Sequence, residues 1–501
     1  MWQTVFVKID GGTNLNPNTP VIVGVSQILQ RGYDKNTFKE PVDLMVEAAR
    51  KAAEDAVSEN MVSEVDSVRV VRGWWRYEHP AGYVAAGLGC KAAEKVGTAY
   101  GGNMVQSLLN ATAKDILEGK NSLVVLTGAE VGNAQAKARK LGHELPQKET
   151  IGSYDRVIGE EKPMSGEAEI ARGILRPIQI YPMFENALRA HLGETIQYHT
   201  ERTSELWARF SEVAASNPDA WISDSKTAPE IASPGPGNRM VSFPYPKLMN
   251  SNNAVDMASA IIICSVRKAK SLGVDESKWI YPWVGTEAND TYLVSARENL
   301  YSSPAIRVAG RRAMDLAGLT ADTIDLVDIY SCFPSAVQIA ARELGFSLEQ
   351  PLTVTGGLTF GGGPLNNYVM HSISRMVDLL RVGTEKKGLI TANGGFLTKH
   401  AFGIYSAMPP KEDFQYENMQ SMVDEMPTRE WVVEHEGEVT VESYTVMFAG
   451  GEVDVGHCAC ITSDGKRTWA NVSDSEVLVA MQGEEFCGRK ARVEAGGMLK
   501  F

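Results

Sequence analysis

The chain has 501 residues, of which 44% are hydrophobic and 22% charged, the profile of a globular protein with sizeable buried cores. A chain of this length is expected to form two or three domains. Acidic residues outnumber basic ones by 62 to 49, which gives a net charge of −13 and argues against nucleic acid as a main partner.

The cysteines and the first residues indicate a protein of a reducing compartment. Six cysteines are spread along the chain without paired spacing, which does not make a disulfide framework. Segment 1–12 (MWQTVFVKIDGG) lacks the basic-then-apolar pattern of a signal peptide, and no run reaches the ~18 apolar residues of a membrane helix. We therefore expect a cytoplasmic or matrix protein without a membrane span.

Two stretches of the chain follow the same order of predicted elements. The first begins with an apolar strand at Pro20 to Val25 and continues with a helix around Leu44 to Ala56, whose small apolar residues fall at helical spacing. One flat face of that helix is expected to pack on a sheet. The elements that follow are a strand at Asp66 to Val71, a glycine turn at Gly101–Gly102, a helix near Gln106 to Leu117, and a strand at Leu123 to Thr127.

The second stretch repeats this order and predicts a duplicated domain. Strands that alternate with helices favour parallel sheets covered on both faces. The predicted elements are a helix at Ala305 to Leu316 ended by Gly318, a strand at Ile324 to Ile329, a turn at Gly361 to Gly363, a helix at Asn367 to Leu380, and a strand at Gly388 to Ala392.

The chain between the two halves, and the chain after them, read differently. The insertion contains a long helical section, Pro182 to Ala215, and a stretch rich in proline and glycine, and an insertion of that size typically caps a site. The tail has short strands with a hairpin signal at Asp464-Gly465, so we expect a small β-rich domain, a barrel. The predicted domains are residues 1–130 with 246–275, the insertion 131–245, the second half 276–410 and the β-rich domain 411–501.

Cys332 follows a predicted strand, and ligands of α/β sheets bind beyond the carboxyl ends of strands. Pro334 suits the first turn of a helix, so Cys332 is expected at a strand-to-helix elbow. The helix dipole there favours an anion and lowers a thiol pKa, which would make Cys332 a nucleophile or an acid–base group. A buried structural cysteine is the alternative.

Two glycine-containing loops carry the other candidates. The turn Gly361 to Gly363 lets a ligand approach the backbone and presents amide donors, although it could also be a tight turn that only packs a helix on the sheet. His400, after the last strand of the second half, is either a base or an exposed loop histidine. The further donor candidates are Asn366, Asn367, Tyr368, Asn393 and Gly394, whereas His371 reads as a packing residue.

The sequence His457-Cys458-Ala459-Cys460, with Cys487 further on, invites a zinc interpretation. It lacks a pair of C-x-x-C knuckles, and alternation along a strand would place Cys458 and Cys460 on one face. Core packing is therefore the preferred interpretation, and we predict no metal site.

The duplicated halves, the insertion and the loops resemble the thiolase superfamily from about Pro20 to Ala407. The motifs that carry the resemblance are PVIVGVSQ in the first strand, Met249 to Ser265 (MNSNNAVDMASAIIICS), IDLVDIYSCF, and GGGP near Gly363. Thiolases make and break C–C bonds with coenzyme A. The resemblance thus implies an α/β thiolase fold of two βαβαβαββ halves in five layers (α-β-α-β-α), with an inserted loop domain and a small OB-like C-terminal domain. It also implies a CoA thioester as substrate and no tightly bound cofactor.

The sequence departs from the thiolase pattern at each catalytic loop. Gly101 stands where the family has its nucleophilic cysteine, and Gly363 stands where it has the histidine of Gly-His-Pro. Tyr330-Ser331-Cys332-Phe333 matches the His-Asp-Cys-Phe loop of sterol-carrier-type thiolases with only Cys332 and Phe333 kept. Ala392 or Asn393 replaces the last cysteine. With the C-terminal extension, this pattern looks most like thiolase-like proteins of type 1, often labelled acetyl-CoA acetyltransferases by similarity.

Three functions are compatible with the resemblance. The first is an acyltransferase of CoA thioesters that departs from the standard thiolase cycle, with Cys332 as nucleophile or acid–base group, Tyr330 and His400 as proton carriers, and Asn367 as a donor. The second is an aldolase-type C–C lyase without an acyl-enzyme, which Tyr330 fits. The third is a non-catalytic CoA-ester binder. Candidates for oxyanion or CoA contacts are Gly362, Gly363, Asn366, Asn393 and Gly394, and the chain is expected to be a monomer or a homodimer.

Overall fold

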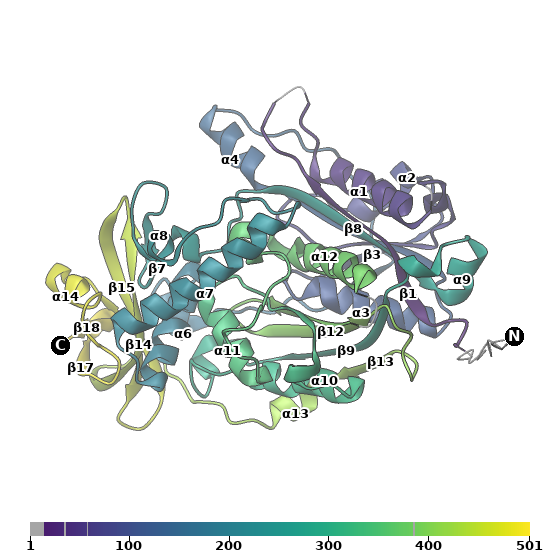
Figure 1. Cartoon of the computed structure of the whole chain (residues 1–501). Coiled ribbons are helices and arrows are strands. Elements are labelled where there is room, and N and C mark those ends of the chain that lie inside the picture. The colour runs from purple at the N-terminus through teal and green to yellow at the C-terminus, as the bar shows by residue number, and fades with distance from the viewer. Residues whose placement is uncertain (1–14, 35–36, 58, 384–385) are drawn as a thin grey trace, which may run out of the picture.

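The computed structural model describes residues 15–34, 37–57, 59–383 and 386–501, so segment 1–12 lies outside the described residues. Two stacked sheets form the centre of the molecule, and a small β domain lies at the end away from the N-terminal half (Figure 1). Among the described residues, no helix combines the length and the apolar character that crossing a membrane requires.

The first sheet has six strands in the order β1-β8-β4-β2-β3-β5. Strand β8 lies antiparallel to β1 and β4, while β2, β3, β4 and β5 run parallel. The sheet is therefore mixed, because the long insertion brings β8 back to the centre of the sheet in the opposite direction. The strands are β1 (Pro20–Leu29), β2 (Ser67–Val70), β3 (Glu94–Thr98), β4 (Leu123–Val131), β5 (Arg156–Ile158) and β8 (Asp256–Ser265).

The second sheet has five strands in the order β10-β11-β12-β9-β13. Strands β11 and β12 pair antiparallel across a short connection, with Asn393 opposite His400. A connection this short joins only antiparallel strands. The strands are β9 (Tyr281–Asn289), β10 (Leu326–Asp328), β11 (Lys387–Gly394), β12 (Lys399–Ser406) and β13 (Gln415–Asn418).

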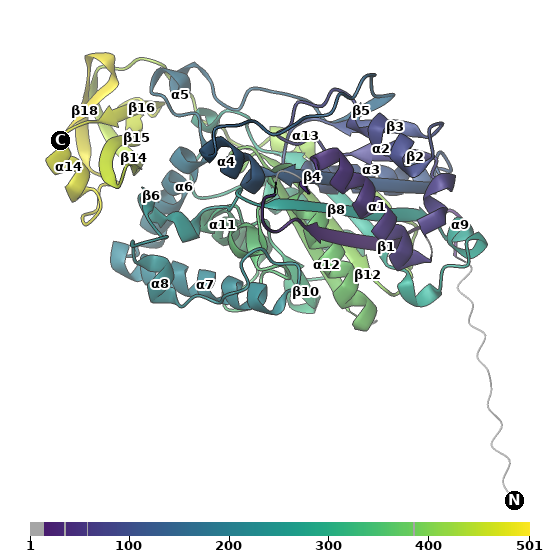
Figure 2. The same cartoon turned by 90° about the horizontal axis from the view of Figure 1, so that it is seen from above.

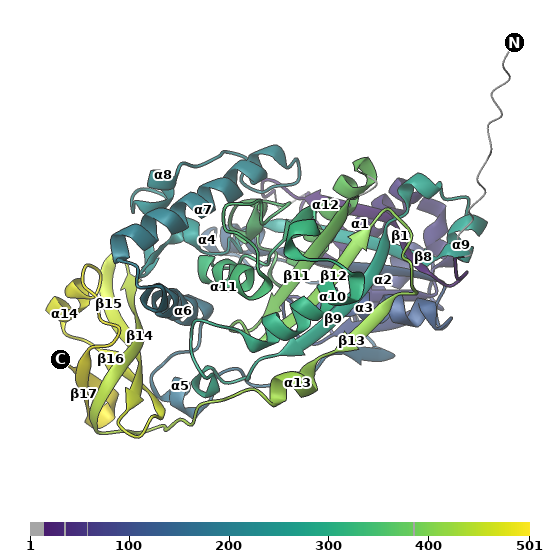
Figure 3. The same cartoon turned by 60° about the horizontal axis from the view of Figure 1, so that its bottom comes forward.

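Helices cover both sheets in the predicted five layers. Helices α3 (Met104–Leu117) and α12 (Tyr368–Val382) lie between the sheets and are buried on most sides, while α1 (Pro41–Ala56) covers the outer face of the first sheet (Figure 2). Helix α10 (Arg311–Ala317) packs on the other face of the second sheet (Figure 3). The remaining helices of the two halves are α2 (Pro80–Leu88), α9 (Val266–Ser271) and α11 (Pro334–Leu344).

The predicted elements of both halves are present, with shifted ends. The helix expected at Ala305 to Leu316 begins with a π-helical turn, Ile306–Gly310, and ends as predicted at Gly318, whose φ of 65° is left-handed. The strand expected at Ile324 to Ile329 is shortened to β10, because Ile324 is the residue that ends a short 3₁₀ turn. The predicted duplication of an α/β unit and the layered arrangement of helices and sheets are confirmed.

The insertion contains two long helices where the sequence indicated one helical section. Helix α6 (Pro177–Leu192) ends at the left-handed Gly193, and the hydroxyl of Thr195 accepts a hydrogen bond from the amide of Tyr198 to begin α7 (Ile196–Ser216). Pro182 lies inside α6. The other elements of the insertion are α4 (Gly132–Lys140), α5 (Glu167–Ala171), α8 (Ala228–Ala232), β6 (Met240–Ser242) and β7 (Tyr245–Pro246).

The C-terminal domain contains a closed barrel of five strands, in agreement with the predicted OB-like domain. Pairing runs β14-β15-β16-β18-β17 and returns to β14. Cys458 and Cys460 are both fully buried in its core, as the strand alternation predicts. The elements are α13 (Gln420–Asp424), β14 (Gly437–Ala449), β15 (Glu452–Thr462), β16 (Arg467–Val472), α14 (Ser475–Ala480), β17 (Lys490–Glu494) and β18 (Met498–Lys500).

Candidate functional site

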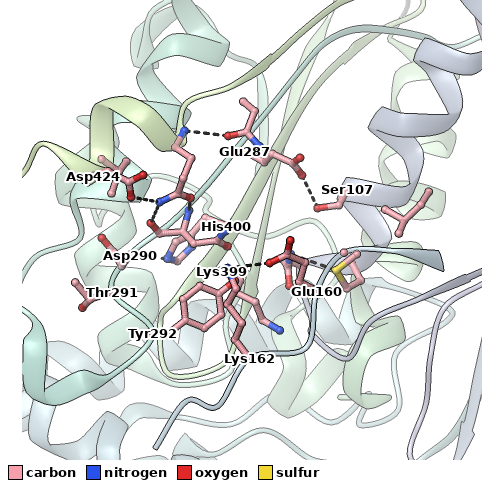
Figure 4. Close-up of a pocket in the computed structure, with 18 of the residues that line it drawn as sticks. Ser107, Glu160, Lys162, Glu287, Asp290, Thr291, Tyr292, Lys399, His400 and Asp424 are labelled. Carbon is pink, nitrogen blue, oxygen red and sulfur yellow. Dashed lines mark hydrogen bonds and ion pairs between the residues drawn. The ribbon is translucent and has the colours of Figure 1, made fainter. Parts of the chain in front are cut away.

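A cavity of about 790 Å³ opens between the edges of the two sheets. Its wall includes the end of β5, the N-terminal turn of α3, the first two residues of β12, and α13 (Figure 4). Carboxylates outnumber amines on this wall, so the cavity does not suit a polyphosphate. The charged groups are Glu160, Glu287, Asp290 and Asp424 against Lys162 and Lys399, with His400 beside them.

His400 is buried in the wall of this cavity and is held by the loop that precedes it. Its Nε2 lies 3.1 Å from the carbonyl oxygen of Leu397 and 3.7 Å from Oδ2 of Asp290. Because a carbonyl oxygen only accepts, Nε2 carries the proton in this contact, and Nδ1 of a neutral ring is left as an acceptor. His400 is therefore a buried imidazole held in one orientation and not an exposed loop histidine.

Asp290 orients this histidine and is itself tightly held. Its carboxylate accepts hydrogen bonds from the amide of Ala305 (3.0 Å), from Ser303 and from the guanidinium of Arg297 (3.1 Å). Burial alone would raise the pKa of Asp290, but Arg297 and His400 outweigh it and leave the pKa lowered. Asp290 therefore stays ionised beside His400.

Tyr330 and Asn393 share a second, much smaller cavity with His400. This cavity has a volume of about 10 Å³ and is also lined by Thr391, whose hydroxyl accepts a hydrogen bond from the amide of Tyr330. Burial raises the pKa of the Tyr330 phenol well above its ordinary value, so Tyr330 is protonated at neutral pH. A Cβ atom added to Gly102 would lie 2.4 Å from the Tyr330 hydroxyl, which therefore reaches the glycine turn that precedes α3.

Cys332 lies at the predicted elbow before α11, but its surroundings do not activate the thiol. Its Sγ accepts a hydrogen bond of 3.6 Å from Nδ2 of Asn393. Asn393 also donates to the hydroxyl of Tyr181, at 3.0 Å, and neither neighbour is a base. Burial raises the pKa of Cys332 to about 12, against the lowering expected from the helix dipole. The desolvation of the partly buried thiol outweighs the dipole of α11.

The glycine turn is engaged within the fold. The amide of Gly363 donates to the carbonyl oxygen of Asn252 at 3.0 Å, and that of Gly362 donates to Gly357 at 3.3 Å. Gly362 has a φ of 115°, and a Cβ atom there would meet the sulfur of Met257 at 2.6 Å. Both glycines therefore permit a close packing of the two halves, and their amides are not free to hold an oxyanion.

Asn366, Asn367 and His371 connect the second half to the first. Nδ2 of Asn366 donates to the carbonyl oxygen of Arg72, and Nδ2 of Asn367 donates to that of Gly128. His371 contacts Gln27, and burial lowers its pKa to about 3, which fits the packing role predicted for it. These side chains are not among those that line either cavity with Tyr330 and His400.

Three residues of the site were not predicted: Tyr181, Asp290 and Lys399. Tyr181 lies on α6 and donates from its hydroxyl to the carbonyl oxygen of Gly395, at 3.1 Å. The only signal in the sequence is that Tyr181 is an aromatic residue directly before the predicted helical section. Asp290 follows β9, a strand that the sequence reading did not single out. Lys399 directly precedes His400, so it lies in a loop that the sequence already marked as a candidate part of the site.

Gly394 and Asn103 pack closely beside Lys399. A Cβ atom added to Gly394 would lie 2.5 Å from Oδ1 of Asn103 and 3.2 Å from Cε of Lys399. The side-chain oxygens of Asn103 and Asn393 are buried and have no hydrogen-bond partner. Among the described residues, no group of three or more histidine, cysteine and acidic side chains is arranged to hold a metal ion.

Two family models match parts of the chain. Residues 418–498 match the thiolase-like protein type 1 additional C-terminal domain, and residues 286–350 match the thiolase C-terminal domain-like family. An acetyl-CoA acetyltransferase of Methanocaldococcus jannaschii is 31% identical over 100 residues, which is 20% of this chain and 25% of that relative. The matched region thus spans about a quarter of the relative's length.

Solved structures match over much more of the chain. The crystal structure of a monomeric SCP2-thiolase like protein type 1 from Mycobacterium smegmatis has a TM-score of 0.82 and 28% identity, covering 96% of this chain and 98% of that one. The Ltp2-ChsH2(DUF35) aldolase has a TM-score of 0.60 and 19% identity over 77% of this chain and 98% of that one, a likeness of fold. The predicted resemblance is confirmed: the chain is similar to a thiolase-like protein of type 1 over nearly its whole length, and its residues 418–498 match the additional C-terminal domain of that type.

Proposed function

We propose that this chain binds a CoA thioester and makes or breaks a C–C bond of its acyl part by an aldol-type reaction, without an acyl-enzyme. One observation carries the proposal: Tyr330, Asn393 and His400 line one cavity, whereas Cys332 lies outside it with a pKa of about 12. An aldol reaction needs a base and a proton donor but no thiol.

The residues have complementary roles in the cleavage direction. Nδ1 of His400 takes the proton of a 3-hydroxyl group, and the ionised Asp290 stabilises the imidazolium that forms. The C2–C3 bond breaks, its electron pair forms the enolate of the thioester, and the C3 fragment leaves as an aldehyde or ketone. Tyr330, which is protonated at neutral pH, gives its proton to the enolate, and the imidazolium of His400 then returns a proton to the Tyr330 phenolate across the small cavity that both residues line.

The surroundings of Cys332 favour this reaction over acyl transfer. A nucleophilic thiol needs a lowered pKa or an adjacent base, and Cys332 contacts the amide of Asn393 and the phenol of Tyr181 instead. The carboxylates of the large cavity favour the uncharged acyl part of the substrate there, with the phosphates of CoA outside.

We also propose that the protein is a monomer. Strand β5 of the insertion pairs with β3 and so covers what would otherwise be an edge of the first sheet. Its own outer edge is only three residues long. Light scattering is expected to give a mass near 54.6 kDa at all concentrations, and a stable dimer would contradict the proposal.

The deciding experiment incubates the protein with acyl-, 3-ketoacyl- and 3-hydroxyacyl-CoA esters and follows intact protein and small molecules by mass spectrometry. We expect a 3-hydroxyacyl-CoA to release an aldehyde or ketone, with no change in protein mass. His400→Gln and Tyr330→Phe should lower the rate by about 10²–10⁴. Cys332→Ala and the matched control Cys90→Ala, a buried thiol elsewhere in the first half, should both retain it.

Two outcomes would contradict the proposal. A covalent acyl mass that disappears in Cys332→Ala, with release of free CoA, would establish acyl transfer instead. If neither protein nor ester changes over hours at high protein concentration, while the ester still binds, the chain is a binder of CoA esters.

A further inference from the structure

Lys399 is a buried amine in the wall of the large cavity, and the proposed reaction does not use it. Its residue is only 6% exposed, whereas Lys162, the other lysine of the wall, has a side chain 52% exposed and an ion pair of 2.8 Å with Glu160 (Figure 4). The two lysines therefore line the same cavity in different environments: Lys399 is buried and Lys162 is exposed to solvent.

Two glycines make the room that the amine occupies. A Cβ atom added to Gly101 would lie 2.8 Å from Nζ of Lys399 and 3.0 Å from its Cε. Gly394, on the neighbouring strand β11, leaves the space beside the same Cε. The resemblance to thiolases puts their nucleophilic cysteine at the position of Gly101, so the amine of Lys399 lies where a side chain of that residue would begin.

In the described part of the chain, the amine of Lys399 has no close carboxylate to stabilise its charged form. It donates to the carbonyl oxygen of Tyr100, and no carboxylate of the described residues lies within 4.0 Å of it. The N-terminal turn of α3, which begins at Met104, places the positive end of a helix dipole beside the amine. Burial lowers the pKa of Lys399, and Glu161 opposes this. The charged or titratable groups around the cavity, besides Lys399 itself, are Glu160, Glu161, Lys162, Glu287, Asp290, Tyr292, His400 and Asp424.

We propose that Lys399 is a reactive amine that forms an imine with an aldehyde or ketone that enters the cavity. The nitrogen lone pair adds to the carbonyl carbon, the amine gives up its protons, and the carbonyl oxygen leaves as water, so the step needs no oxidant or reductant. The two protons of the amine end on that oxygen, so the water carries away every atom that the imine does not keep.

This inference does not rest on the proposed aldol reaction, because free carbonyl compounds test it directly. The two are chemically related, since an aldol cleavage releases an aldehyde or ketone. If both hold, Lys399 retains that fragment in the cavity after the C–C bond breaks.

The test traps the imine in the full-length protein. The protein is incubated at pH 7 with low millimolar propanal or butanone and sodium cyanoborohydride, and the sites of alkylation are mapped after digestion with a protease that cleaves at acidic residues. An ordinary lysine is only about 0.04% neutral at pH 7, and each unit by which its pKa falls raises that fraction about tenfold. We expect Lys399 to be alkylated at least about tenfold faster than Lys162.

Variants separate the amine from its cavity. Lys399→Met and Lys399→Arg should both lose the adduct, and Lys399→Arg retains a cation if the methionine variant does not fold. Lys162→Arg should keep the adduct at residue 399. Alkylation of Lys399 at or below the rate of Lys162 in the wild-type protein would overturn the proposal, whatever the variants do.

Discussion

Replacing Asp290 by asparagine tests how the buried ion pair supports the site. Asp290 and Arg297 are both about 95% buried, with exposures of 5% and 4%, and their side chains meet at 3.1 Å. The substitution keeps the shape of Asp290 but removes its charge. Arg297 would then retain only neutral acceptors, among them the carbonyl oxygens of Leu397 (2.9 Å) and Ser302 (3.0 Å).

The expected loss follows from the uncompensated guanidinium. Removing one partner of a buried pair costs about 3–5 kcal/mol of unfolding free energy. Urea unfolding followed by tryptophan fluorescence measures it, with Asp424→Asn as the matched control. Asp424 lines the same cavity but is exposed, so its substitution should stay within about 0.5 kcal/mol of the wild type.

The pH dependence gives the same prediction a second test. The folded-state pKa of Asp290 is lowered, so its ionisation contributes stability above the unfolded-state pKa of about 3.9. That contribution is lost as the pH falls through the folded-state pKa. The difference between Asp290→Asn and wild type should therefore be constant near pH 7 and shrink below about pH 4. A difference under about 1 kcal/mol at pH 7 would refute the reasoning.

Three further predictions concern the packing and the thiol. Gly102→Ala would bring a Cβ atom to 2.4 Å from the backbone oxygen of Asn393. We expect the free energy of unfolding to fall by about 1–3 kcal/mol, measured by thermal unfolding. An unchanged melting temperature would contradict the close approach. Arg467 is fully buried, pairs with Glu442 and donates to backbone oxygens of the second half. Arg467→Met should therefore lower the free energy of unfolding by about 3–5 kcal/mol and speed proteolysis between core and barrel. Equal proteolysis rates for variant and wild type would contradict this role of Arg467. With a pKa of about 12, Cys332 should be alkylated by iodoacetamide about tenfold faster for each pH unit from 7 to 10, and a rate that levels off below pH 8 would show an activated thiolate.

Periodicity along the chain predicted the fold to a large extent. The helix face of small residues that ends at Ala56 is buried on the first sheet, and Cys458 and Cys460 alternate into the barrel core. Gly318 ends its helix in the left-handed conformation that glycine adopts without steric cost. These are local properties, fixed by spacing and by the conformations that each residue type allows.

The strand directions and the ends of the capping helices needed the folded chain. Alternating strands and helices favoured parallel sheets, but both sheets are mixed because the returning strands β8 and β12 run against their neighbours. The single helical section predicted in the insertion is two helices, because Gly193 ends the first helix and the Thr195 side chain caps the start of the second.

The residues of the candidate site were also predicted only in part. The rule that ligands bind at strand ends selected Tyr330, Asn393 and His400, which the fold does bring together around one cavity. Spacing could not show that Asp290, 110 positions earlier than His400 in the numbering, orients that histidine. Spacing also could not show that the amide of Gly363 donates a hydrogen bond to the carbonyl oxygen of Asn252.

The sequence by itself thus determined which residue types stand at the strand ends and that the standard thiolase nucleophile is missing. Only the tertiary structure decided which of those groups are buried, what they contact and in which direction burial shifts their pKa. The helix dipole at Cys332 is a local effect, but the desolvation that raises its pKa comes from chain segments distant in sequence. The same burial at Lys399 works in the opposite direction and favours the neutral amine, because desolvation always penalises the charged form of a group.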